Sequence, residues 1–244
     1  MNAHLTWATS ARVLRQIRHD RRTLALLLVV PCLLLGLAAW VFDQTPIFDT
    51  VGGPLLGIFP FVIMFLLTSI VTLRERQTGT MERLFTMPLG KGDFVAGYAL
   101  AFGLLATIQA AIASLFAVWV LDLSIAGPVW MLIVVAVVDA VLGSVFGLFL
   151  SAFAATEFQA VQFMPAFVLP QFFLCGLFVE RSDLPRALEL LSDVLPLSYA
   201  VDAMKEIVSR TDPGTDVAGD LLIILVFVVA SIAAGAATLR RRTA

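Results

Sequence analysis

The side chains with the densest chemical functionality lie in one polar stretch between two long apolar runs. This stretch, Arg74 to Leu89, reads RERQTGTMERLFTMPL and brings charged groups of both signs close together. Thr78, Gly79 and Thr80 are residue types that can begin a helix. Glu82 would then lie in its first turn, where the positive end of the helix dipole favours an acid. The stretch therefore predicts a short helix of its own.

Apolar residues give this predicted helix one hydrophobic face. Met81, Leu84 and Phe85 recur at helical spacing. Pro88 ends the helix because its ring cannot continue the backbone hydrogen bonding. A short amphipathic helix between two apolar segments can lie flat on lipid or dock into a partner protein. The residues alone leave both interpretations open.

Catalytic signatures are missing from the sequence. It contains no His-Glu-x-x-His, no Gly-x-Ser-x-Gly and no phosphate-binding loop ending in Lys-Ser or Lys-Thr. His4 and His19 both precede the first apolar run, and Cys32 and Cys175 lie inside apolar runs, which indicates no disulfide or metal framework. We therefore expect a protein that is not an enzyme and binds no cofactor or metal itself. If ATP drives it, a partner must hydrolyse the ATP.

Asp139 is the one charged residue between Val129 and Ala155. An acid at the centre of a membrane span costs roughly 2.5–3.5 kcal/mol on insertion scales, so it should face protein or water. Three alternatives are open for Asp139: it binds a cationic substrate, it faces a path between two paired chains, or it hydrogen-bonds a neighbouring Ser, Thr or Gln. Glu157 lies just after this run, in a predicted polar turn at 155–160, where it either contacts a partner or is solvated.

Amide and aromatic side chains follow Glu157 in the next apolar run. They are suited to lining a path for a hydrophobic substrate, and equally to interhelical hydrogen bonds and lipid contact. With Asp139, the candidate substrate-path residues are Gln162, Phe163, Phe167, Gln171 and Phe172.

The composition indicates an integral membrane protein. Of the 244 residues, 60% are hydrophobic and only 14% are charged, and the charges are separated by long uncharged runs. We predict an all-α polytopic membrane protein. Its six transmembrane helices would span 23–42, 54–73, 94–121, 129–154, 161–179 and 221–239.

The remaining segments predict shorter helices. Residues 1–22 predict an amphipathic helix in the membrane interface, with Trp7 and Ile17 on its apolar face and Arg12 on its polar face. Residues 180–220 predict two short helices that dip into or lie on the membrane.

Two further patterns concern packing and orientation. Gly143 and Gly147 have the Gly-x-x-x-Gly spacing of closely packed helices, within the chain or between two chains. Twelve Lys and Arg residues fall in the two ends and the 74–93 connector, and four in the opposite loops. The positive-inside rule therefore predicts that both termini and the connector are cytoplasmic.

Three stretches together resemble type-2 ABC transporter permeases, the membrane subunits of drug and polysaccharide exporters. Glu75-Arg76, Gly79 to Glu82 and Leu84 to Leu89 resemble the cytoplasmic loop of that family. Phe172 to Phe178 resembles its phenylalanine-rich stretch, and Leu195 to Ala203 resembles the segment after its external loop. The chain departs from the family pattern in having Cys175 in place of Ser and Glu180 where Pro is frequent.

The resemblance implies a role for each part. The connector would be a coupling helix that docks into a separate ATPase subunit, which would bind the ATP and Mg²⁺. Two permease chains would pair in a bacterial inner membrane, with no nucleic-acid partner, and 183–209 would form an external gate. The substrate would be amphiphilic or hydrophobic: a drug, antibiotic or lipid, with a polysaccharide left open. The implied coupling residues are Glu75, Arg76, Gly79, Thr80, Met81, Glu82, Arg83, Leu84, Phe85 and Glu157.

Two alternatives do not need an ATPase. An ion-coupled secondary transporter or channel would use Asp139 as its coupling carboxylate, although no internal repeat of the kind common in such transporters is evident. A non-transporting membrane scaffold would explain the apolar runs but not the resemblance at the connector.

Overall fold

The regular structure of the chain is helical throughout the residues that the computed structural model describes, which are 3–42, 47–78 and 90–238. Two single-turn 3₁₀ helices lie at Ser151–Phe153 and Arg181–Asp183. The α-helices are α1 (Ala3–His19), α2 (Arg21–Val41), α3 (Ile47–Gln77), α5 (Lys91–Trp119), α6 (Val129–Leu150), α7 (Glu157–Leu174), α8 (Arg186–Asp193), α9 (Pro196–Ser209) and α10 (Gly214–Thr238).

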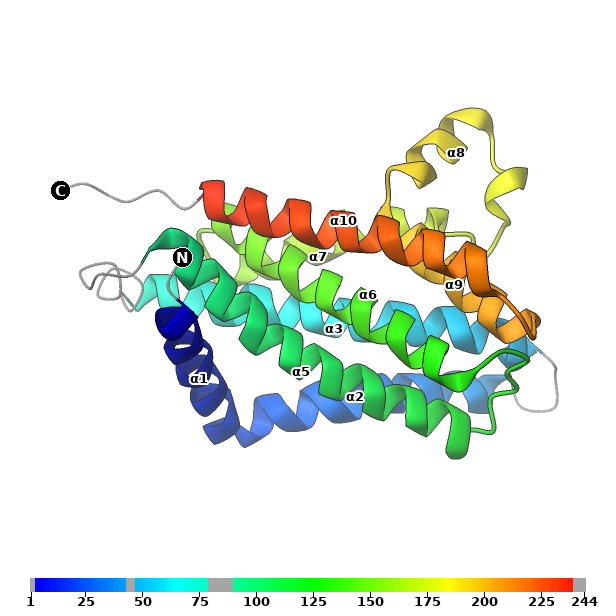
Figure 1. The fold of residues 1–244 in the computed structure, drawn as a ribbon, viewed down its shortest axis with the longest axis horizontal. Helices are drawn as coiled ribbons and strands as arrows, with labels where there is room; N and C mark the ends of the chain where they lie inside the picture. Colours follow the sequence, from blue (N-terminus) through cyan, green and yellow to red (C-terminus); the bar gives the residue numbers. More distant parts are fainter. Residues whose placement is uncertain (1–2, 43–46, 79–89, 239–244) are drawn as a thin grey trace.

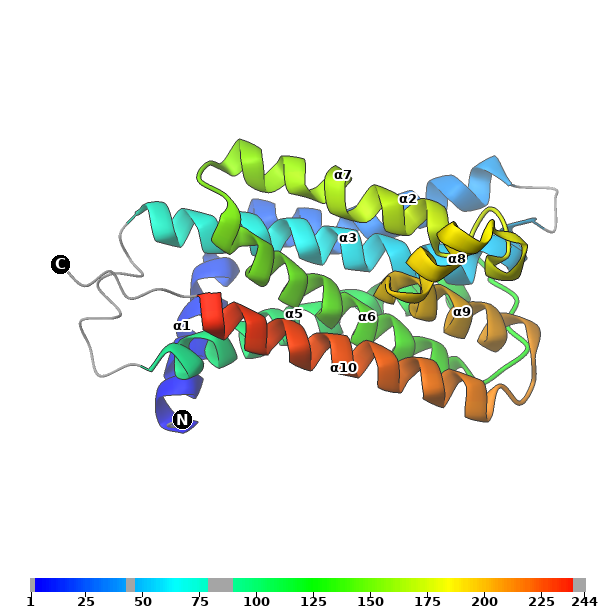
Figure 2. The same cartoon turned by 90° about the horizontal axis from the view of Figure 1, so that it is seen from above.

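The long helices lie side by side as a bundle, and α1 crosses one end of it at a steep angle to them (Figure 1). The end of α3, the start of α5 and the end of α10 lie at this same end, which we call the connector end (Figures 1 and 2). The short α8 projects from the opposite end, which we call the α8 end. The two ends of the described chain therefore lie on one side of the bundle (Figure 1).

Five described helices are long and apolar enough to cross a membrane. They are α2, α3, α5, α10 and α6 with the turn that extends it to Phe153. The predicted fifth span, 161–179, corresponds to α7, which is 18 residues long and is not among these five. Its two prolines, three glutamines and Glu157 lower its apolar character. The membrane-crossing role of α7 stays a prediction.

The predicted bounds of α7 and α3 were wrong at three places. The predicted turn at 155–160 is largely helical because the Thr156 side chain accepts a hydrogen bond from Gln159 N at 3.2 Å and so begins α7. Helix α7 ends at Leu174, five residues early, and Gly176 follows with φ +87°, a conformation that favours glycine. Residues 47–53, predicted as loop, are the first turns of α3.

Helices α3 and α6 pack closely because of two glycines. A Cβ added to Gly143 or Gly147 on α6 would lie 2.3 Å from the backbone oxygen of Phe61 or Phe65 on α3. No side chain fits at that distance, so glycine lets the two backbones meet. The Gly-x-x-x-Gly pattern therefore serves packing within the chain, which was one of the two alternatives.

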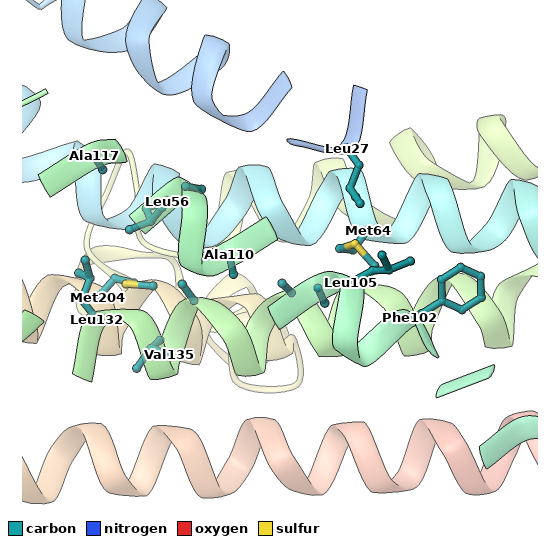
Figure 3. Packing of buried hydrophobic residues seen from close by; sticks show 14 of the residues in the cluster. Leu27, Leu56, Met64, Phe102, Leu105, Ala110, Ala117, Leu132, Val135 and Met204 are labelled. Atoms are coloured by element: carbon teal, nitrogen blue, oxygen red, sulfur yellow. The ribbon is translucent and has the colours of Figure 1, made fainter. Parts of the chain in front are cut away.

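The core fills the space between α3, α5 and α6 with interlocking aliphatic and aromatic side chains (Figure 3). Helix α9 joins it from the α8 end, where Met204 packs among residues of the other helices. The buried face of α9 includes Leu197, Val201 and Ile207. Helix α9 is thus a packed helix rather than one lying on the membrane surface.

Candidate functional site

The last four residues of α3, Arg74 to Gln77, tie three parts of the bundle together. They begin the predicted coupling segment at 74–93, of which residues 79–89 lie outside the described residues. Their side chains point in different directions around α3, since successive residues of a helix are about 100° apart. Arg74, Arg76 and Gln77 contact the connection between α6 and α7, and Glu75 contacts α1.

Arg74 and Glu157 form a two-pronged ion pair. The Arg74 Nε and Nη2 atoms donate to the two carboxylate oxygens of Glu157 at 2.8 and 3.1 Å. These hydrogen bonds hold the pKa of Glu157 below its ordinary value. Both side chains are about half exposed, so solvent screens the pair and it contributes little to stability. Its consequence is geometric, because it fixes the start of α7 to the end of α3.

Arg76 and Gln77 bind backbone carbonyls just beyond α6. Arg76 donates to the carbonyl oxygens of Ser151 and Ala152 at 2.5 and 3.3 Å, and Gln77 donates to that of Ala155 at 3.0 Å. The last carbonyls of a helix have no partner inside the helix, so donors from a neighbour satisfy them. The α6–α7 connection is therefore attached to α3 at several points.

Glu75 faces the opposite side and is buried. Its two oxygens accept hydrogen bonds from Arg12 of α1 at 3.1 and 3.0 Å, and the Glu75 side chain is only 4% exposed. Arg12 also donates to the hydroxyl of Tyr98 on α5 at 2.5 Å, and its guanidinium carbon lies 5.7 Å from the centre of that ring. Glu75 is an internal link between α1, α3 and α5.

The sequence did not reveal the partner of Glu75. The prediction that Arg12 lies on the polar face of an interfacial helix is wrong, because α1 turns Arg12 towards α3 and α5. The predicted apolar face of α1 is also divided, since Ile17 is buried and Trp7 is 70% exposed. A signal was present in Glu75 itself, an acid next to a membrane span that needs a cation nearby.

The other predicted coupling residues lie outside the described residues. They are Gly79, Thr80, Met81, Glu82, Arg83, Leu84 and Phe85. The structure therefore describes the two ends of the 74–93 connector and not residues 79–89.

Asp139 lies in the interior of the bundle with no exposed surface. Neither of its carboxylate oxygens has a hydrogen-bond partner within the described part of the chain. A Cβ on Gly57 of α3 would lie 3.6 Å from Asp139 Oδ2 and 3.8 Å from Met204 Cγ of α9. The alternative of a hydrogen bond to a neighbouring Ser, Thr or Gln is not seen among the described residues, and the carboxyl group lies between three helices.

The substrate-path candidates of α7 do not converge with Asp139. Gln171 is buried, donates to Phe167 O at 3.2 Å and accepts from Leu197 N at 3.4 Å. It therefore links α7 to the start of α9, as the alternative of interhelical hydrogen bonding predicted. Gln162 is exposed.

The aromatic candidates of α7 lie at separate places along it. Phe163 packs beside Leu73 and Ala154 near the connector end. Phe167 stacks edge-on against Phe146 of α6, with ring centres 5.6 Å apart. Phe172 contacts the rings of Phe173 and Phe178. These aromatic candidates therefore make separate contacts along α7.

At the α8 end, Arg181 holds the predicted external gate together. Its guanidinium pairs with Asp193 at 2.5 Å and with Asp202, and it lies over the ring of Tyr199 at 5.0 Å. Burial raises the pKa of Asp202, and the bonds from Arg181 oppose this. Arg181 thus ties the segment before α8 to both α8 and α9.

Comparison with known proteins agrees with this architecture. The sequence profile described as "ABC-2 type transporter" matches residues 4–208. The chain belongs to the ABC-2 type transporter family. The match extends from α1 through most of α9, so it includes the polar contacts at the end of α3 and the segment that we compared with a coupling helix.

Several curated relatives of this ABC-2 chain are named as permeases. It is 26% identical over 181 residues to the linearmycin resistance permease protein LnrN of Bacillus subtilis, covering 74% of this chain and 47% of the relative. It is 26% identical over 188 residues to the probable multidrug ABC transporter permease YbhR of Escherichia coli K12, covering 77% and 51%. The chain thus spans about half the length of these relatives. It is a multi-pass membrane protein of a transporter family.

Proposed function

We propose that the chain is the membrane-spanning subunit of an ATP-driven exporter, with the 79–89 segment docked in a separate ATPase subunit. The observation that supports this most is the set of contacts made by Arg74 to Gln77. Because these residues join α3 to α1, α5 and the α6–α7 connection, a displacement of the connector would move all four parts together. A helix that merely rests on lipid would not need such a rigid base.

The proposed substrate is an amphiphilic or hydrophobic molecule such as a drug, antibiotic or lipid. The names of the relatives refer to linearmycin resistance and to multidrug transport. The described helices carry few charges in their central turns, which suits such a substrate better than an ionic one. Two chains would pair to enclose the path, and the Arg181 cluster would close it on the outside.

The proposed location is a bacterial inner membrane with the connector end in the cytoplasm. The excess of Lys and Arg in the connector and terminal segments supports this orientation. An ATPase in the cytoplasm would then meet the connector directly and would supply the bound ATP and Mg²⁺.

The test is transport and ATP hydrolysis in vesicles that contain the chain and the ATPase encoded beside it. The Leu84→Ala/Phe85→Ala variant should abolish ATP-dependent transport while the protein remains folded, because it removes the apolar docking face. A matched control is Leu33→Ala/Leu37→Ala on α2, where both side chains are exposed far along the bundle. Transport that survives in the connector variant would refute ATPase docking.

Asp139 supports a second candidate function, an ion-coupled transporter. Its buried carboxyl group has no hydrogen-bond partner among the described residues, which is unusual for a merely structural acid. Substrate movement driven by an ion gradient without the ATPase, and lost in Asp139→Asn, would establish this alternative in place of the first.

A further inference from the structure

The junction between α1 and α2 carries an unpaired cluster of positive charge. Arg15 and Arg18 lie in the last turns of α1, and Arg21 and Arg22 begin α2. All four side chains are exposed. None of them forms an ion pair within the ranges that the structure describes, whereas Arg12 on the same helix pairs with Glu75.

No neighbouring acid neutralises this cluster. Asp20 is the only acidic residue among the first 42. Its carboxylate accepts hydrogen bonds from Thr23 N at 3.1 Å and Thr23 Oγ1 at 2.6 Å and so caps α2. These hydrogen bonds from Thr23 lower the pKa of Asp20, so its carboxylate stays ionised at the start of α2. Asp20 offsets one of the four arginine charges, and the junction keeps an excess of positive charge.

The cluster lies at the end of the exposed apolar surface of α2. Helix α2 buries only Leu27, Pro31 and Leu35 and exposes a row of aliphatic side chains, of which Leu26 is the first. Leu26 follows Arg22 by four residues, which is about 6 Å along a helix. The arginines thus lie one turn above the apolar surface of α2, and α1 turns away across the end of the bundle (Figure 1).

We propose that this junction binds the headgroups of anionic phospholipids in the leaflet at the connector end. Guanidinium groups donate paired hydrogen bonds to phosphate oxygens, and clusters of four or more Lys or Arg beside a membrane span are typical of anionic-lipid recognition. The exposed ring of Trp7, at 70%, suits the same interfacial layer. Bound lipid would hold α1 in place, and with it the Arg12–Glu75 pair.

The test is electron paramagnetic resonance of spin-labelled lipids around the purified chain in vesicles, without any ATPase. We expect labelled phosphatidylglycerol to be enriched several-fold over labelled phosphatidylcholine in the motionally restricted shell. The enrichment should fall to near parity in Arg15→Gln/Arg18→Gln/Arg21→Gln/Arg22→Gln and persist in the corresponding Lys variant. Arg18→Gln alone should give an intermediate value, which keeps the test informative if the fourfold variant does not fold.

The control removes two exposed arginines that are paired, Arg186→Gln and Arg210→Gln, near the α8 end. This variant should retain the enrichment. Equal restriction of both lipids around the wild type, or enrichment unchanged without the four arginines, would overturn the proposal. Loss of enrichment on adding millimolar inorganic phosphate would also overturn it and assign the site to free phosphate. Because no ATP is used, failure here is distinct from failure of the exporter proposal.

Discussion

At the scale of single residues, Glu75 shows how a buried charge next to a membrane span is stabilised by a partner of opposite charge. Its carboxylate has almost no exposed surface and two hydrogen bonds from Arg12. Glu75→Gln would leave Arg12 without its counter-charge, and we expect a loss of about 1–3 kcal/mol in the free energy of unfolding. Thermal unfolding in detergent measures this change.

A double-mutant cycle separates the pair from its surroundings. Because Arg12 loses its main partner in Glu75→Gln, the Arg12→Gln/Glu75→Gln variant should be destabilised by less than the sum of the two single variants. Strict additivity would show that the two side chains do not interact, contrary to the described geometry.

Asp139 presents the opposite situation, a buried carboxyl group without any partner among the described residues. Replacing it with an apolar residue removes an unsatisfied polar group, so Asp139→Val should raise the free energy of unfolding by about 1–3 kcal/mol. Ser144→Ala is the matched control, because Ser144 is buried on the same helix but donates to Val141 O at 2.7 Å. A loss of stability in Asp139→Val would indicate that the carboxyl group has a stabilising contact.

At the scale of elements, the contact between α3 and α6 depends on the absence of side chains. Gly143→Ala and Gly147→Ala would each place a methyl group 2.3 Å from a backbone oxygen of α3. The backbones must separate, and we expect a loss of about 1–3 kcal/mol for each variant. Gly219→Ala on α10, where nothing lies within 4 Å of the added methyl group, should be neutral or stabilising. Thermal unfolding of the three variants side by side tests this.

Hydrophobic runs were sufficient to predict most helices, because a span of this length must satisfy its backbone hydrogen bonds internally. The bounds were predicted less well. Residues 47–53 contain Asp49 and two glycines, which are typical of loops, yet they continue α3. The end of α7 depends on Gly176 and its conformation, which the apolar pattern before it does not reveal.

Only the part of the candidate site that is contiguous in the sequence could be predicted. The polar run that begins at Arg74 was evident in the sequence. Charged residues next to membrane spans are energetically unfavourable unless they have a partner or a function. The partners of that run come from residue 12 and from residues 151–157, and only the packing of α1 and of the α6–α7 connection against the end of α3 brings them together. A helical-face pattern identifies an amphipathic face but not which neighbour it meets.

At the scale of the whole molecule, α3 connects both ends of the bundle. It packs against α2, α5, α6, α7 and α9, and its last turn holds α1 and the α6–α7 connection. Motion entering at the connector would therefore reach α9 and the Arg181 cluster through packed helices rather than through loops. Such a path requires that the contacts at the end of α3 be stiff.

This requirement leads to a prediction that separates coupling from folding. Arg76→Gln removes the donors to Ser151 and Ala152 while leaving the Arg12–Glu75 pair intact. In vesicles with the neighbouring ATPase, we expect transport per ATP hydrolysed to fall several-fold, with ATP hydrolysis and thermal stability largely retained. Arg186→Gln, which removes an exposed ion pair near the α8 end, should leave this ratio unchanged. If Arg76→Gln lowered transport and hydrolysis by the same factor, the contact would serve docking or folding, and the link from connector to bundle would have to run through Arg12 and Glu75 instead.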